Sequence, residues 1–155
     1  MRILVMSDCH GEISAARTAL YDQMQVSDVI FLGDGAADIE ELSADFPEKK
    51  FHIVCGNCDF FSPFPDRLII KLGGKTIFAC HGHTYHVKYG HERAVGAAAA
   101  AGCDILLFGH THKAMTDYEN GLYIMNPGSL SASGDHSYGF IDITPAGIAM
   151  NIVSL

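Results

Sequence analysis

The chain has 155 residues, of which 48% are hydrophobic and 18% charged, a composition typical of a globular protein and not of a disordered one. A formal net charge of −8 without a run of Lys or Arg argues against binding of long nucleic acids, which requires that many phosphates be neutralised. The most apolar uncharged stretch, Ala94–Cys103, is far shorter than the ~18 residues of a membrane-spanning helix.

The first third of the chain alternates apolar runs with segments of helical periodicity. The apolar runs show little alternation, which is typical of parallel strands covered on both faces, and they are Arg2–Ser7, Asp28–Leu32 and Phe51–Val54. Between them, Glu12–Met24 and Asp38–Asp45 have helical spacing, with Asp38 as the expected N-cap of the second helix. This order predicts a parallel β-α-β-α-β unit.

The rest of the chain predicts mainly hairpins and one further helix. Gly73-Gly74 is a hairpin signal, and a helix is predicted from Lys88 to Ala101, where Gly102 ends it. The predicted strands are Leu68–Leu72, Thr76–Cys80, Ile105–Phe108, Met115–Tyr118, Leu122–Met125, Tyr138–Ile143 and Ile148–Val153. A parallel unit followed by hairpins predicts two packed sheets with helices outside them.

The N-terminal residues and the cysteines bear on location and domain organisation. No signal-peptide pattern precedes the first predicted strand. The five cysteines are scattered and do not resemble the framework of a small secreted protein, which favours a reducing compartment. We therefore expect one soluble, cytoplasmic domain over residues 1–155.

Polar side chains follow five of the predicted strands, at the positions where open α/β sheets bind ligands. The residues with metal-binding side chains are Asp8, His10, Asp34, Asn57, His81, His110 and His112. In the pairs Asp8/His10 and His110/His112, a spacing of two on extended chain points both side chains the same way. Oxygen and imidazole donors suit Mn²⁺, Fe or Zn²⁺. Seven donors predict two ions that share a carboxylate and can activate a hydroxide.

The order D-x-H, G-D, G-N-x-D, H-G-H and G-H-T-H, from Asp8 to Ser129, resembles the calcineurin-like metallophosphoesterases. The short chain and its Asn126-Pro127-Gly128-Ser129 turn are similar to the small prokaryotic phosphodiesterase branch, which also includes the retromer scaffold subunit. The resemblance implies a four-layer α/β/β/α sandwich with a binuclear centre that prefers Mn²⁺, with Fe, Zn²⁺ or Ni²⁺ as alternatives. It implies one ion at Asp8, His10, Asp34 and His112, and a second at Asp34, Asn57, His81 and His110.

The ligand set and the resemblance together predict a phosphodiesterase in which a hydroxide that bridges the ions attacks a small phosphodiester. Asn57 is expected to contact the non-bridging phosphate oxygens. Larger family members carry a histidine after this asparagine, but here the residue is Cys58, so the leaving group would be protonated by His83, by Cys58 or by water. Asp59 is expected to orient the loop of Asn57 and Cys58.

Two alternatives remain open at this stage. A phosphomonoesterase would need cationic residues for the extra negative charge, and only Lys113 directly follows a motif. A non-catalytic scaffold of the same fold would be expected to lack ligands, whereas all seven are present here. The Phe and Tyr residues of loops 60–66 and 84–89 predict contacts either to the substrate or to a second copy in a homo-oligomer.

Overall fold

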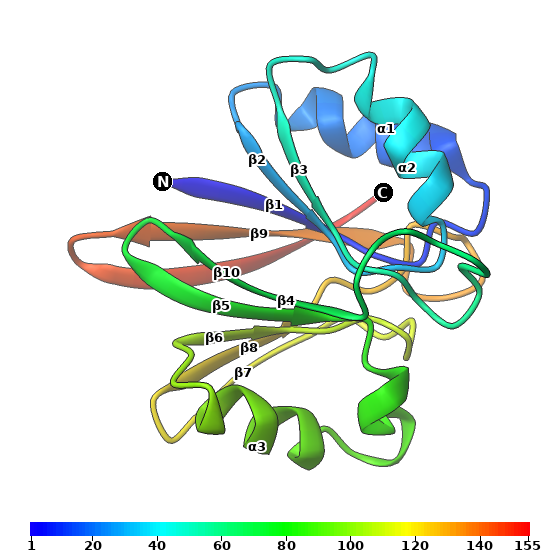
Figure 1. Cartoon of the computed structure of the whole chain (residues 1–155). Coiled ribbons are helices and arrows are strands. Elements are labelled where there is room, and N and C mark those ends of the chain that lie inside the picture. The colour runs from blue at the N-terminus through cyan, green and yellow to red at the C-terminus, as the bar shows by residue number, and fades with distance from the viewer.

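The computed structural model describes residues 1–155 and contains two five-stranded mixed sheets and three α-helices (Figure 1). The strands are β1 (Arg2–Met6), β2 (Asp28–Phe31), β3 (Lys50–Ile53), β4 (Arg67–Leu72), β5 (Lys75–Cys80), β6 (Ile105–Leu107), β7 (Met115–Glu119), β8 (Leu122–Asn126), β9 (Ser137–Thr144) and β10 (Gly147–Ser154). The α-helices are α1 (Ile13–Asp22), α2 (Ala36–Ser43) and α3 (Glu92–Ala100). Short 3₁₀ turns lie at His83–Tyr85 and Val87–Tyr89.

The first sheet has the strand order β10-β9-β1-β2-β3, and the second has the order β4-β5-β6-β8-β7. Strands β1, β2 and β3 are parallel, as expected from their uninterrupted apolar runs. The predicted hairpins β4–β5, β7–β8 and β9–β10 are all antiparallel pairs. Each predicted strand is present, and each of its boundaries lies within one residue of the prediction.

Alternation along β1 divides the core into layers. Leu4 and Met6 pack in a cluster with the apolar faces of α1 and α2. Ile3 and Val5 point the other way, into a second cluster between the two sheets. A third cluster, which includes Phe78, packs the second sheet against α3. The four-layer α/β/β/α sandwich is therefore confirmed, with α1 and α2 on one outer face and α3 on the other (Figure 1).

Two helix starts differ from the sequence-based expectation. Helix α2 begins at Ala36 with Gly35 as its N-cap, so the prediction of Asp38 as N-cap was wrong and Asp38 lies in the first turn. Helix α3 begins at Glu92, because the segment expected to open it at Lys88 forms a 3₁₀ turn that ends at Gly90, with φ of 138°. A φ in that range is incompatible with helix continuation.

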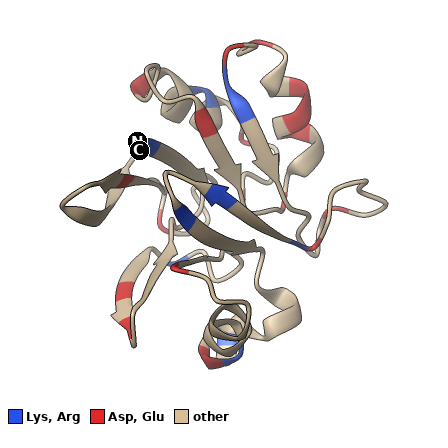
Figure 2. Cartoon of the chain, turned by 60° about the vertical axis from the view of Figure 1, so that its left-hand side comes forward, with Lys and Arg blue, Asp and Glu red and all other residues tan.

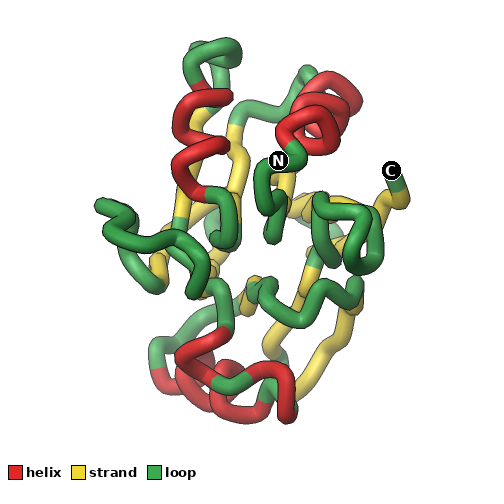
Figure 3. Tube along the Cα trace, turned by 90° about the vertical axis from the view of Figure 1, so that its right-hand side faces the viewer, coloured by secondary structure: helices red, strands yellow, loops and turns green.

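The ends of β1, β2, β3, β5 and β6 meet at one edge of the molecule, where loops from both sheets face one another (Figure 3). Apart from the pair Lys49-Lys50, Lys and Arg residues are spread singly along the chain and form no longer basic run (Figure 2). None of the helices has the length and apolar character required to span a membrane. The edge with the loops is where the predicted ligand residues lie.

Candidate metal centre

Seven side chains with metal-binding groups come from five loops at this edge. Asp8 and His10 follow β1, Asp34 follows β2, Asn57 follows β3, His81 follows β5, and His110 and His112 follow β6. The expectation that the Asp8/His10 and His110/His112 pairs lie on extended chain was wrong. All four residues and Asp34 have φ between 44° and 66°, in the left-handed region. Such backbone is sparsely populated by non-glycine residues and is concentrated at functional sites.

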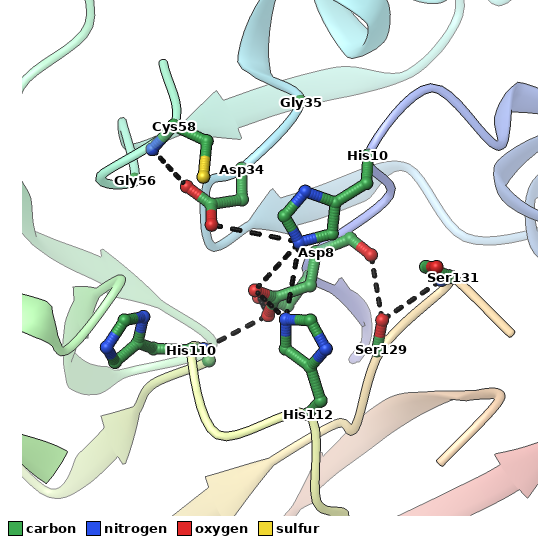
Figure 4. Close-up of polar contacts among 12 residues, drawn as sticks. Asp8, His10, Asp34, Gly35, Gly56, Cys58, His110, His112, Ser129 and Ser131 are labelled. Carbon is green, nitrogen blue, oxygen red and sulfur yellow. Dashed lines mark hydrogen bonds and ion pairs between the residues drawn. The ribbon is translucent and has the colours of Figure 1, made fainter. Parts of the chain in front are cut away.

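The first group consists of Asp8, His10 and His112, whose ligand atoms all lie within 4.8 Å of one another (Figure 4). Nε2 of His112 is 3.1 Å from Oδ1 of Asp8 and 3.2 Å from Nε2 of His10. Asp8 is fully buried, and its Oδ1 lies 3.1 Å from Nε2 of His112 without a hydrogen bond that satisfies it. A buried carboxylate oxygen without a donor is costly unless a cation meets it.

The environment keeps Asp8 ionised. Burial acts to raise its pKa, but the nearby imidazole of His112, the charge of His81 and the Ser7 hydroxyl together lower it. Reciprocally, the contact with Asp8 raises the pKa of His112 above its ordinary value. Oδ2 of Asp8 accepts hydrogen bonds from Ser7 and from the backbone N–H of His110, which leaves Oδ1 as the free ligand atom.

The second group consists of Asp34, His81 and His110, with Asn57 beside them. Nδ1 of His81 donates to the carbonyl of Leu32 at 2.7 Å, so in the neutral ring Nε2 presents a lone pair. That Nε2 faces Oδ1 of Asn57 at 3.1 Å, Nδ1 of His110 at 3.1 Å and Oδ2 of Asp34 at 3.5 Å. Burial lowers the pKa of His110 to about 4, and the charges of His81 and Lys88 act in the same direction.

This convergence of acceptor atoms is the arrangement that a divalent cation stabilises. Around Nε2 of His81, the oxygens of Asn57 and Asp34 can only accept hydrogen bonds. Nδ1 of a neutral His110 is the one atom of this group that can carry a hydrogen besides Nε2 itself, so the lone pairs outnumber the hydrogens. Oxygen and imidazole donors at these separations match Mn²⁺, Fe or Zn²⁺ chemistry. The donors present therefore fit the ions that the sequence predicts.

A single oxygen of Asp34 lies between the two groups. Oδ2 is 3.8 Å from Nε2 of His10 in the first group and 3.5 Å from Nε2 of His81 in the second. The other oxygen, Oδ1, accepts the backbone N–H of Cys58 at 2.7 Å, which fixes the orientation of the carboxylate (Figure 4). With only 3% of the residue exposed, Asp34 has little freedom to turn away.

Asp59 joins the loops after β2 and β3. Its carboxylate accepts four backbone N–H groups at 2.7–2.9 Å, from Asp34, Gly35, Ala36 and Gly56. Although burial acts to raise it, the pKa of Asp59 is lowered by these hydrogen bonds. The expected role in orienting the Asn57 loop is thus accompanied by a second one. Asp59 also caps the first turn of α2, which explains why that helix begins at Ala36.

Cys58 and His83, the residues predicted to act on the leaving group, both adjoin the second group. Cys58 is an exposed residue whose Sγ lies 3.3 Å from Nδ2 of Asn57, and partial desolvation of the thiol together with the neighbouring Asp34 raises its pKa. The ring of His83 lies 5.4 Å from that of His81, and its buried Nδ1 has no hydrogen-bond partner. Burial and the charge of His81 lower the pKa of His83.

Several supporting residues were missed or interpreted differently from the sequence. Ser129, interpreted as a turn residue, is buried and donates to the carbonyl of Asp8 at 2.9 Å (Figure 4). Asn126 donates from Nδ2 to the carbonyl of Gly109 and to Oγ1 of Thr111, both at 2.9 Å, and so holds the loop of His110 and His112. Asn126 and Ser129 both belong to the N-P-G-S turn, which was recognisable in the sequence. The neighbouring residues did not indicate which loops this turn contacts.

Gly56 is required by a close approach of the two loops. A Cβ added there would collide with Oδ1 and the backbone N of Asp34. We expect Gly56→Ala to lower the free energy of unfolding by about 1–3 kcal/mol, as overpacking does, and to weaken metal binding. Gly96→Ala is the matched control, because a Cβ on this residue of α3 meets nothing within 4 Å.

The control should change stability in the opposite direction, since alanine favours a helix interior over glycine by about 0.5–1 kcal/mol. Urea denaturation of both variants measures the two changes, and calorimetric Mn²⁺ titration measures the affinity. If Gly56→Ala were as stable as Gly96→Ala and bound Mn²⁺ like the unmodified chain, the close approach of Gly56 to Asp34 would contribute neither to stability nor to metal binding.

Two packed mixed sheets with His and Asp groups gathered at their common edge define a metallophosphoesterase-like fold. The family model described as the calcineurin-like phosphoesterase superfamily domain matches residues 1–145, and the chain belongs to this superfamily. The Bacillus subtilis protein named probable metallophosphoesterase YsnB is 33% identical over 132 residues, which cover 84% of this chain and 75% of the relative. The phosphodiesterase YfcE of Escherichia coli K12 is 26% identical over 172 residues, which cover 92% and 88%.

Solved structures share the fold over nearly the whole chain. A predicted phosphoesterase from Streptococcus pneumoniae superposes with a TM-score of 0.81 at 26% identity, covering 99% of this chain and 88% of the other. Vacuolar protein sorting 29 from Cryptosporidium parvum superposes with a TM-score of 0.75 at 22% identity, covering 99% and 98%. At that identity the second likeness concerns the fold alone.

Proposed function

We propose that the chain is a binuclear metal-dependent phosphodiesterase that hydrolyses small phosphodiesters. The observation that carries this proposal is the oxygen of Asp34 placed between two groups of ligand atoms, each group converging without enough hydrogens to satisfy it. The names of two relatives support the reaction class, since YsnB is named a probable metallophosphoesterase and YfcE a phosphodiesterase.

The seven ligands would divide between two ions. Asp8, His10, Asp34 and His112 would hold one, and Asp34, Asn57, His81 and His110 the other, with Mn²⁺ preferred and Fe, Zn²⁺ or Ni²⁺ as alternatives. Two bound divalent ions supply positive charge and lower the pKa of bound water, which makes it a nucleophile near neutral pH. Asp8 and Asp34 then serve as ligands and not as general bases.

The remaining side chains position the substrate. The amide Nδ2 of Asn57 contacts only Sγ of Cys58, a weak acceptor, so it can instead donate to a non-bridging phosphate oxygen. Cys58 and His83 adjoin the same group and are the residues placed to contact the leaving oxygen. Nδ1 of His83 is buried without a hydrogen-bond partner, so the contact to the leaving oxygen would be made by Nε2, the other ring nitrogen.

The direct contacts of the ligands favour a diester over a monoester. No Lys or Arg side chain forms a hydrogen bond or ion pair with any of the seven residues, although the chain contains ten. A phosphomonoester dianion would leave one more negative charge to be met than a diester does. The positive charge of the two ions alone would be sufficient to balance the single negative charge of a phosphodiester.

The test compares bis(p-nitrophenyl) phosphate with p-nitrophenyl phosphate, using metal-stripped protein to which Mn²⁺ is restored. We expect Mn²⁺-dependent release of p-nitrophenol from the diester at a rate well above that from the monoester, and two ions bound per chain. If the monoester were hydrolysed faster than the diester, the chain would instead be a phosphomonoesterase. Absence of turnover with two ions bound would favour the non-catalytic scaffold.

A further inference from the structure

A groove with a cavity volume of about 610 Å³ lies beside the loop that carries His110 and His112. Val87, Phe108, Ala114 and Met115 form its apolar part, and Lys88 and Lys113 line it with ammonium groups. We call this surface the lysine groove. It joins two segments far apart in sequence, the 3₁₀ turn Val87–Tyr89 and the stretch from the end of β6 into β7.

The lysine groove lies beside the loop of the candidate metal centre, and none of the seven ligands lines it. Thr111, which lines it, is the residue between the two ligands His110 and His112, and Lys113 follows them directly. Lys88 is close enough that its charge acts on both imidazoles. An ester arm that extends from the centre past Thr111 would reach the two lysines.

The two lysines are free to meet an anion. Both are exposed, and neither forms an ion pair with a carboxylate, although the chain carries a net charge of −8. Acidic side chains lie beyond His91, which also lines the groove and whose Nε2 is 3.4 Å from Oε1 of Glu119. An anionic group is thus favoured at the lysine end, next to the centre, and disfavoured beyond His91.

The apolar part of the groove suits a flat or hydrocarbon body. Phe108 and Val87 form a buried floor, and Met115, which is half-buried, adapts readily to irregular ligands. The ring of His91 stacks on that of Phe108 with centroids 5.9 Å apart, so the two rings together form an aromatic wall of the groove. Apolar lining with a few placed charged groups is typical of small-molecule sites.

We propose that the lysine groove binds an ester arm of the substrate and selects arms in which an apolar or aromatic body carries a further phosphate group. This inference rests on the proposed phosphodiesterase function and narrows its substrate class. The natural substrate would then be a nucleotide-like phosphodiester with an additional phosphate, and Lys88 and Lys113 would determine specificity without touching the scissile phosphate.

The test uses two chromogenic diesters that differ by one group, thymidine 5′-(p-nitrophenyl phosphate) and the same compound phosphorylated at the 3′ oxygen. Hydrolysis of either breaks the same P–O bond and releases p-nitrophenol, so the ratio of their kcat/KM values reports only on the added phosphate. We expect a ratio of about 10 or more for the unmodified chain, and a ratio near 1 for Lys88→Gln/Lys113→Gln, because two charge-assisted contacts are lost. The preference should also fall as salt is added.

Lys71→Gln is the matched control, since Lys71 is an exposed residue of β4 that does not line the groove, and it should keep the ratio of the unmodified chain. Turnover of both diesters at equal efficiency, or a ratio unchanged in the double variant, would overturn the inference while the phosphodiesterase proposal stood. If neither diester were hydrolysed, the phosphodiesterase proposal would fail on these substrates.

In that case, measurements of nucleotide binding test the role of the lysine groove independently of turnover. Calorimetric titration should show thymidine 3′,5′-bisphosphate binding about tenfold more tightly than thymidine 5′-monophosphate, with the difference lost in Lys88→Gln/Lys113→Gln and kept in Lys71→Gln. Equal affinities of the unmodified chain for the two nucleotides would overturn the inference.

Discussion

Replacing Asp34 with asparagine is expected to lower Mn²⁺-dependent diester hydrolysis by more than ~100-fold, beyond the ~10–100-fold cost of losing a supporting contact to a metal ligand. Oδ2 of Asp34 is the one atom that approaches both ligand groups. An amide removes the negative charge that would hold two cations close together, so the number of bound ions should fall from two to at most one per chain.

The fold should survive this change. An asparagine can still accept the backbone N–H of Cys58 through the oxygen that Oδ1 now provides. Asp45→Asn is the control, because it removes the same charge from an exposed carboxylate that pairs with Arg17 at 2.8 Å, away from the ligands. Metal analysis and steady-state kinetics of both variants give the comparison. Two bound ions and unaltered turnover in Asp34→Asn would contradict the binuclear scheme.

The parallel strands β1 and β2 could be predicted because strands that are buried on both faces consist almost entirely of apolar residues. Ile3, Leu4 and Val5 are all fully buried, so an uninterrupted apolar run marks a strand covered on both faces. The hairpin at Gly73-Gly74 was predictable for a similar local reason, since both glycines have positive φ. The resemblance of the motif order then supplied the four-layer arrangement.

Features that depend on distant contacts could not be predicted in this way. The capping group of α2 is Asp59, which follows the helix start at Ala36 by a whole helix and strand. The left-handed backbone of Asp8 and His10 is imposed by contacts between loops and not by glycine. Lys88 reaches the surroundings of His110 only because a 3₁₀ turn replaces the expected start of α3.

Asp59→Asn is expected to lower the free energy of unfolding by about 3 kcal/mol, on the scale of one or two hydrogen bonds to a charged group. Each carboxylate oxygen of Asp59 accepts two backbone N–H groups. An asparagine keeps one oxygen, while its NH₂ group must face the other two donors. For a chain of this size the loss corresponds to a fall in Tm of roughly 6–12 °C.

Asp135→Asn separates this effect from the loss of a charge. The carboxylate of Asp135 accepts only one backbone N–H, from Ala114 at 2.8 Å, and the oxygen of an asparagine can replace that acceptor. Its Tm should therefore change little, whereas Asp59→Asn should also bind Mn²⁺ about 10–100-fold more weakly, because Asp59 holds the backbone of Asp34 and Gly56 in place. Differential scanning calorimetry with and without Mn²⁺ measures both quantities. Equal Tm values for the two variants would show that the four hydrogen bonds do not connect the loops energetically. A lowered Tm with unchanged Mn²⁺ affinity would restrict Asp59 to capping α2.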